Sequence, residues 1–145
     1  MVPGHDPMAG LAAAHLELLT LCDTLEGIAD SLPGTLDVRL CQEAAETLVP
    51  VVTRVHRTEE NVIFPAVIGN RADSMSSETV EHLRAEHCED ECFAEELADA
   101  LSQAGRRDAR IQPETLGYML RGFFEAMRRH INFERERLSI LASRL

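Results

Sequence analysis

The histidine–glutamate pairs His56–Glu60 and His130–Glu134 each have a spacing of four residues. Both pairs lie in segments with helical periodicity, where a spacing of four residues places two side chains on the same face. The neighbouring positions on these faces are apolar, so each carboxylate is predicted to point toward a protein core. A charged carboxylate is costly there unless it is paired or binds a cation. The two pairs therefore indicate a buried metal site.

Two further histidines lie on apolar faces of other predicted helices. His15 falls between Leu11 and Leu18, and His87 follows Leu83 by four residues. A single buried histidine is more often part of a structural hydrogen-bond network than a metal ligand. Four imidazoles and two carboxylates in one metal-free core would leave several polar atoms without partners. The conjunction favours metal binding over a purely structural polar network.

The segments that carry these residues have a simple predicted organisation. Apolar residues recur at spacings of three and four over roughly residues 7–32, 36–67, 77–104 and 113–142. Short connections between four long helices predict an all-α protein, a single antiparallel up-down-up-down four-helix bundle that forms one domain over residues 1–145. Pro50, inside the second predicted helix, is expected to kink it or to mark an irregular turn.

Composition limits the partners that this chain is expected to bind. The 145 residues carry a net charge of -11, which argues against nucleic acid or an anionic membrane surface as the main partner. Without an apolar run of 18 residues or a signal peptide, we expect no transmembrane helix and a cytoplasmic location. The four cysteines include no CxxC pair and are predicted to be reduced thiols. Oligomeric state is not indicated.

The types of ligand limit the metal. Imidazole with carboxylate, without paired thiolates, suits iron, manganese or zinc rather than an iron–sulfur cluster. Six protein ligands exceed what one tetrahedral zinc uses. Two carboxylates that can bridge, with two histidines for each metal, fit a dinuclear site inside a bundle. The ferritin-like version has a glutamate three residues before its histidine, a spacing that no histidine has here.

The whole pattern resembles hemerythrin-like proteins of the HHE cation-binding family. The resemblance runs from residue 6 to about residue 141 and rests on His15, His56-x-x-x-Glu60 with the trailing Phe64-Pro65, Glu86-His87 and His130-x-x-x-Glu134. It implies a hemerythrin-like bundle with two iron ions in an oxygen-bridged diiron centre, manganese or zinc being less favoured. It further implies that Glu60 and Glu134 bridge the irons and that His15, His56, His87 and His130 are terminal ligands.

One departure from the family pattern concerns a fifth histidine. Oxygen-carrying hemerythrins have another histidine four residues from the ligand on the third helix. Here His82 lies five residues before His87, which rotates it away by roughly 140°, so His82 is predicted to lie at the surface. Glu91, four residues after His87, is a possible additional ligand or part of a charged helix flank. Glu59 is expected either to accept a hydrogen bond from outside the ligand set or to face water.

The ligand count suggests a class of reaction. Two octahedral irons offer about twelve positions, and the implied protein ligands with one bridging oxygen fill about ten of them. Open coordination positions on the irons favour a reaction over the reversible carrying of a ligand. We therefore expect a protein that binds or reacts with O2, H2O2 or nitric oxide for sensing, storage or detoxification. The alternatives are a diiron enzyme, for catalase-like peroxide disproportionation or iron donation in iron–sulfur cluster repair, and a metal-dependent regulatory interaction module.

Overall fold

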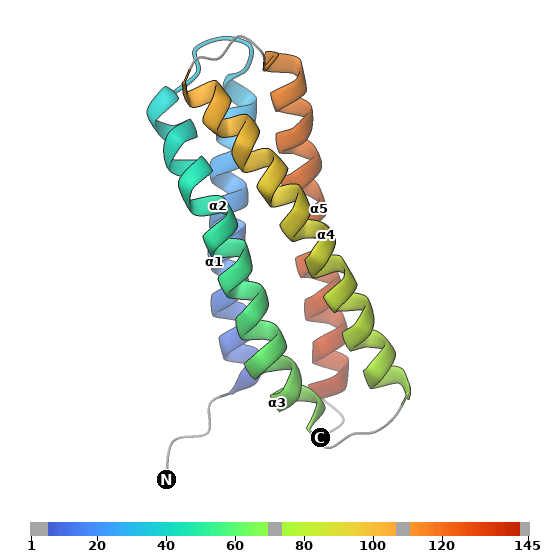
Figure 1. The fold of residues 1–145 in the computed structure, drawn as a ribbon. Helices are drawn as coiled ribbons and strands as arrows, with labels where there is room; N and C mark the ends of the chain where they lie inside the picture. Colours follow the sequence, from blue (N-terminus) through green and yellow to red (C-terminus); the bar gives the residue numbers. More distant parts are fainter. Residues whose placement is uncertain (1–5, 70–73, 107–110, 143–145) are drawn as a thin grey trace.

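The computed structural model describes residues 6–69, 74–106 and 111–142, and these form a bundle of helices (Figure 1). The long helices are α1 (Pro7–Ser31), α2 (Val38–Thr58), α4 (Ser74–Gly105) and α5 (Pro113–Ala142). A short π-helix η1 (Glu59–Ile63) and helix α3 (Phe64–Ile68) continue α2. The described residues contain no strand. The predicted all-α bundle is confirmed.

Local sequence explains where the first two long helices begin. The Asp6 side chain accepts a hydrogen bond from the backbone N–H of Met8, and proline follows at the first helical position. Asp37 caps α2 in the same way, through the N–H of Leu40. Such caps satisfy backbone donors that a helix leaves free at its N-terminus. Pro50 does not end α2, which continues to Thr58.

The long helices are arranged as a closed cycle of neighbours. α1 packs against α2 and α5, and α4 packs against the same two helices. Successive long helices run in opposite directions, as Figure 1 shows. The N-terminal part of α1 therefore lies at the same end of the bundle as α3, the start of α4 and the end of α5.

The buried apolar residues fall into two clusters along the bundle. A large cluster includes Leu18, Val55, Ala94 and Ile131, among others. The second cluster is smaller and consists of Leu11, Ile63, Phe64, Val67, Leu83, Leu138 and Leu141. The chain passes from one cluster to the other in each of the four antiparallel arms of the bundle. Each crossing occurs at a residue of the predicted metal site.

The π-helix is the one irregular turn in the second arm. The backbone N–H of Phe64 donates to the carbonyl of Glu59, five residues earlier, instead of four. Pro65 follows at once. Proline lacks the N–H that an α-helix would direct to the carbonyl of Asn61, and its ring clashes with that carbonyl. A wider turn before Pro65 relieves the conflict and adds one residue to the turn.

α1 has an unusually apolar composition for a surface-facing helix. By length and hydropathy it is the helix of the described part that resembles a membrane span, with a mean hydropathy of 1.2 over its most apolar window. Core helices of bundles pass the same test. The buried face of α1 carries His15 together with Leu11 and Leu18, so its apolar character also serves the core.

Candidate metal centre

Six ionisable side chains form a buried layer between the two apolar clusters. Each is at most 7% exposed, and they come from all four arms: His15 on α1, His56 on α2, Glu59 on η1, His87 on α4, and His130 and Glu134 on α5. We call this set the polar layer. Five of its members were predicted from the sequence as ligands, and the sixth, Glu59, was not.

Glu134 lies at the centre of the polar layer. One of its carboxylate oxygens, Oε1, lies 3.1 Å from Nε2 of His15. The other, Oε2, lies 2.7 Å from Nε2 of His130 and 3.6 Å from Nε2 of His87. This carboxylate therefore faces imidazoles from three helices, an arrangement suited to bridging two cations.

Glu59 makes the corresponding contacts from the second arm. Its Oε1 lies 3.3 Å from Nε2 of His15, and its Oε2 lies 3.0 Å from Nε2 of His87. Ligand atoms of Glu59, His87, His130 and Glu134 all lie within 4.8 Å of one another. The structure thus brings together two carboxylates that both contact His15 and His87.

The sequence placed Glu60, not Glu59, in this position, and the structure corrects that placement. The Glu60 side chain is 28% exposed, with Oε1 at 3.8 Å from Nε of Arg84 and 3.7 Å from Nδ1 of His87. Glu59 lies three residues after His56 and four before Ile63, and both spacings also keep side chains on one helical face. Of the two adjacent glutamates, Glu59 is the buried one.

The sequence suggested Glu91 as a possible additional ligand and Glu59 as a possible hydrogen-bond acceptor outside the ligand set. In the structure these two positions are reversed. Oε1 of Glu91 lies 3.3 Å from Nδ1 of His56, on the outer side of that imidazole. Nε2 of His56 is buried and finds no hydrogen-bond partner among the described residues. Glu91 is thus placed as a hydrogen-bond acceptor behind a proposed ligand, while Glu59 lies inside the layer.

Sequence reasoning missed a second such acceptor, Glu86. Its Oε2 accepts a hydrogen bond from Nδ1 of His130 at 2.6 Å, which directs Nε2 of the same ring toward Glu134. The dipeptide Glu86-His87 marked this glutamate only as part of a family pattern. Its contact crosses from α4 to α5, and no periodicity within one helix could have predicted it. His82 lies at the surface with a side chain 56% exposed, as predicted.

The metal-free layer leaves several buried polar atoms unsatisfied. Within the described residues, no hydrogen bond reaches Nδ1 of His15, Nε2 of His56, either ring nitrogen of His87, or Oε2 of Glu59. His87 and Glu59 approach to 3.0 Å, yet this contact lacks hydrogen-bond geometry. Buried polar atoms without partners are rare and costly. A cation that accepts electron pairs from these nitrogens and oxygens would satisfy them, so the donor set fits a metal.

The ring packing also fits a site that excludes water. The imidazoles of His56 and His87 stack with centroids 3.8 Å apart and planes inclined by 6°. Phe64 lies on the same side of the layer, with its ring 5.8 Å from that of His87. Two stacked imidazoles cannot both be positively charged without strong repulsion.

The pKa values of the layer show how strongly its groups interact. Burial would lower the pKa of His87, but the adjacent carboxylates of Glu134 and Glu59 outweigh burial and raise it to about 10. Burial lowers the pKa of His56 to about 3, helped by the charges of His87 and His130. Burial would raise the pKa of Glu134, but the surrounding histidines hold it well below its usual range. The metal-free layer therefore combines the ionised carboxylate of Glu134, the neutral imidazole of His56 and a proton on His87.

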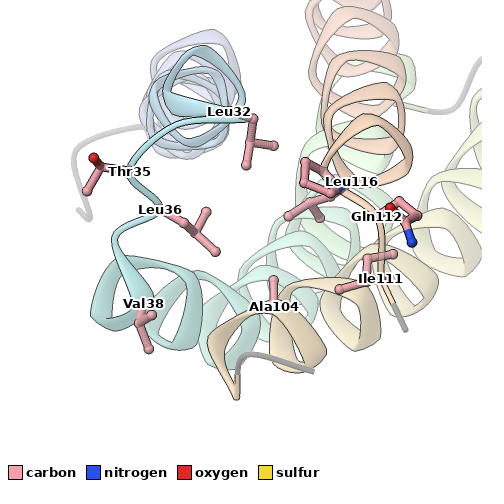
Figure 2. A pocket seen from close by; sticks show the side chains of 9 residues that line it. Leu32, Thr35, Leu36, Val38, Ala104, Ile111, Gln112 and Leu116 are labelled. Carbon is pink, nitrogen blue, oxygen red and sulfur yellow. The ribbon is translucent and has the colours of Figure 1, made fainter. Parts of the chain in front are cut away.

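Two cavities differ in their relation to the polar layer. One of about 320 Å³ has His130 in its wall and is also lined by Glu86, Glu89, Asp90 and Phe133. A larger cavity of about 400 Å³ lies at the other end of the bundle, where Leu32, Leu36, Ile111 and Leu116 surround it (Figure 2). The lining of the second cavity contains no charged or metal-ligating side chain. Of these two cavities, it is the one beside His130 that is lined by ionisable side chains.

Comparison with known families agrees with this site. Residues 6–139 match the hemerythrin HHE cation-binding domain. Because the match covers nearly the whole chain, this protein belongs to the hemerythrin family of HHE cation-binding domains. Comparisons with curated proteins and with solved structures find no match.

Proposed function

We propose that the polar layer binds two iron ions and that the resulting centre reacts with a small oxidant, namely O2, H2O2 or nitric oxide, in the cytoplasm. The observation that carries this proposal is the set of six buried ligands in which two carboxylates each contact imidazoles of more than one helix. The set is too large for one tetrahedral zinc. Imidazole and carboxylate together suit iron.

Each residue has a defined part in this proposal. Glu59 and Glu134 would bridge the ions and offset their charge, since both already contact His15 and His87. His15, His56, His87 and His130 would each supply one nitrogen. Iron, when bound, supplies a reversible change of oxidation state. The chain's own contribution is to hold the ligands fixed and to exclude bulk water with an apolar cluster on either side.

The cavity beside His130 supports approach by a small molecule. Its volume of about 320 Å³ exceeds the roughly 30 Å³ that one water occupies. Its lining includes Asp90, whose pKa burial raises to about 6. A carboxyl group that exchanges protons near neutrality beside a redox centre is suited to reactions that consume protons, such as peroxide reduction.

The test is metal analysis joined to absorption spectroscopy of the purified protein. We expect about two irons per chain, and an absorption band in the near ultraviolet that changes when O2, H2O2 or nitric oxide is added to the reduced protein. A single zinc, or no metal after anaerobic iron loading, would refute the dinuclear site. An iron-loaded protein whose spectrum responds to none of the three molecules would refute the reaction. Peroxide turnover above that of free iron would identify catalysis.

A further inference from the structure

A line of contacts joins the protein surface to the centre of the polar layer. Nε2 of His82 lies 3.1 Å from Oε1 of Glu86, and Oε2 of Glu86 lies 2.6 Å from Nδ1 of His130. Nε2 of His130 then lies 2.7 Å from Oε2 of Glu134. The His82 side chain is 56% exposed, whereas Glu134 is fully buried. Both oxygens of Glu86 are therefore engaged, one by an outer and one by an inner imidazole.

The inner contact fixes how His130 can bind a cation. Because Glu86 is an acceptor, Nδ1 of His130 carries a hydrogen, so a cation would bind at Nε2, which in the metal-free layer donates to Oε2 of Glu134. A carboxylate behind a ligand imidazole orients the ring and makes it a stronger donor to metal. The short distance of 2.6 Å is typical of a charge-assisted hydrogen bond.

Among the described residues, this arrangement is specific to His130. His56 has a carboxylate behind it, Glu91, at 3.3 Å, but Glu91 has no recorded contact with an outer histidine. Nδ1 of His15 has no hydrogen-bond partner within the described part of the chain. Nδ1 of His87 faces Glu60 at 3.7 Å, and the outer partner of Glu60 is Arg84. Among the four imidazoles of the described layer, His130 is therefore the one linked through a carboxylate to a surface histidine.

We infer that His82 and Glu86 act together as positioning residues that set the donor strength of His130, with His82 as the end that responds to pH. This inference rests on the proposed function, because it concerns the same metal centre. Histidine side chains ordinarily titrate between about pH 5 and 8. A proton on His82 would place a positive charge against the outer oxygen of Glu86, which would then accept less strongly from His130.

The charges around His82 allow it to act in this way. On its own helix its direct partner is Glu86, and Glu78 and Glu81 are exposed neighbours in sequence. On α5 the edge of Phe133 faces the His82 ring, with centroids 5.5 Å apart. Arg137 lies on that phenyl ring, 5.2 Å from its centre, so aromatic carbon separates this positive charge from His82. Arg129 lines the cavity that Glu86 and His130 share.

The direction of the effect follows from the charges. When His82 is neutral, Glu86 accepts fully from His130, and the imidazole donates more electron density to a bound cation. Stronger donation favours the higher oxidation state, so the reduction potential of the iron centre should be lower when His82 is neutral than when it is protonated. His82→Gln keeps a donor to Glu86 without a titrating group, and should flatten this part of the pH profile.

The experiment compares four proteins: wild type, His82→Gln, Glu86→Gln and Glu89→Gln. Glu89 lines the same cavity and is the matched control, since its change removes an equal charge without a recorded contact with His130. Competition with a chelator should show an affinity for Fe²⁺ at least about 10-fold weaker in Glu86→Gln than in Glu89→Gln. Potentiometry between about pH 5.5 and 8.5 should show a smaller change of potential with pH in His82→Gln than in wild type.

A second measurement separates this inference from the diiron proposal. In the metal-free protein, nitrogen NMR of the imidazole rings should show that the Nδ1–H signal of His130 shifts when His82 becomes protonated, and that His82→Gln abolishes this shift. Wild-type protein that binds no iron would refute the proposed function alone. The inference is overturned if His130 is insensitive to His82 by NMR, or if Glu86→Gln binds Fe²⁺ as tightly as Glu89→Gln.

Discussion

At the scale of single residues, the decisive choice is between two adjacent glutamates. Glu59 is 1% exposed and contacts His15 and His87, whereas the Glu60 side chain is 28% exposed. We predict that Glu59→Gln lowers metal affinity by about 10-fold or more, because a neutral amide cannot bridge two cations as a carboxylate does. Glu60→Gln removes the same charge one residue away and should lower it by less. Metal per chain after dialysis against a chelator measures both.

The pair is informative because the two possible results have different causes. If Glu60→Gln proves the more damaging change, the main carboxylate ligand of the second arm is Glu60 and not Glu59. Equal losses would show that both carboxylates contribute. Circular dichroism of both variants serves as the control that the bundle remains folded.

The cysteines differ in reactivity at the same scale. Cys22 and Cys41 are buried, and burial raises the pKa of the Cys22 thiol to about 11. Cys88 and Cys92 are exposed on α4. Because the thiolate is the reactive form, we predict that an alkylating reagent modifies Cys88 and Cys92 rapidly in the folded protein. Cys22 and Cys41 should react only after unfolding. Mass spectrometry of modified peptides distinguishes these sites, and rapid labelling of Cys22 would contradict the buried placement.

At the scale of helices, Pro50 tests how far tertiary packing overrides local preference. α2 continues through this exposed proline, although proline inside a helix costs about 3 kcal/mol relative to alanine. We predict that Pro50→Ala raises the free energy of unfolding by about 1–3 kcal/mol, because it restores a backbone donor and buries nothing new. Urea denaturation of the metal-free protein measures the change. A lower free energy of unfolding would mean that Pro50 itself contributes to the packing of α2.

The helices also show what could be predicted from the sequence. Apolar periodicity correctly placed His15, His56, His87, His130 and Glu134 on buried faces, because burial in a bundle repeats with the period of the helix. The same period left two adjacent candidates in the second arm, because Glu59 and Glu60 follow His56 at spacings of three and four, which both keep a side chain on one face. The contacts of Glu86 and Glu91 were not predictable, because they depend on how α4 faces α5 and α2.

At the scale of the whole molecule, the polar layer divides the core in two. Six ionisable side chains separate the two apolar clusters. The core is therefore well packed only if these side chains find charged or hydrogen-bonding partners. Buried charges are costly unless they are fully paired. In the metal-free protein, protons bound to histidines balance the carboxylate charges. This is clearest at His87, whose pKa is raised to about 10. A cation would take the place of these protons.

The replacement of bound protons by a cation predicts opposite effects of pH on the stability of the metal-free and metal-loaded proteins. The pKa of His87 rises from an ordinary 6.5 to about 10 on folding. Its contribution to the free energy of unfolding is therefore complete below about pH 6.5 and is lost as pH rises through 10. The pKa of His56 falls from 6.5 to about 3 on folding, so the free energy of unfolding also decreases as pH falls from 6.5 toward 3. The metal-free protein should therefore be most stable near pH 6 to 7.

Metal binding should remove the loss on the alkaline side. Ligand nitrogens must be deprotonated to bind a cation, so metal affinity rises with pH over the range in which His87 loses its proton. We predict that the melting temperature of the metal-free protein falls between pH 6.5 and 9.5, and that the gain on adding metal grows over this interval. Thermal unfolding with and without metal measures both effects. The measurements are made at raised salt, which screens the repulsion among the surplus acidic groups. A metal-free protein that becomes more stable toward pH 9.5 would show that no proton on His87 holds the layer together.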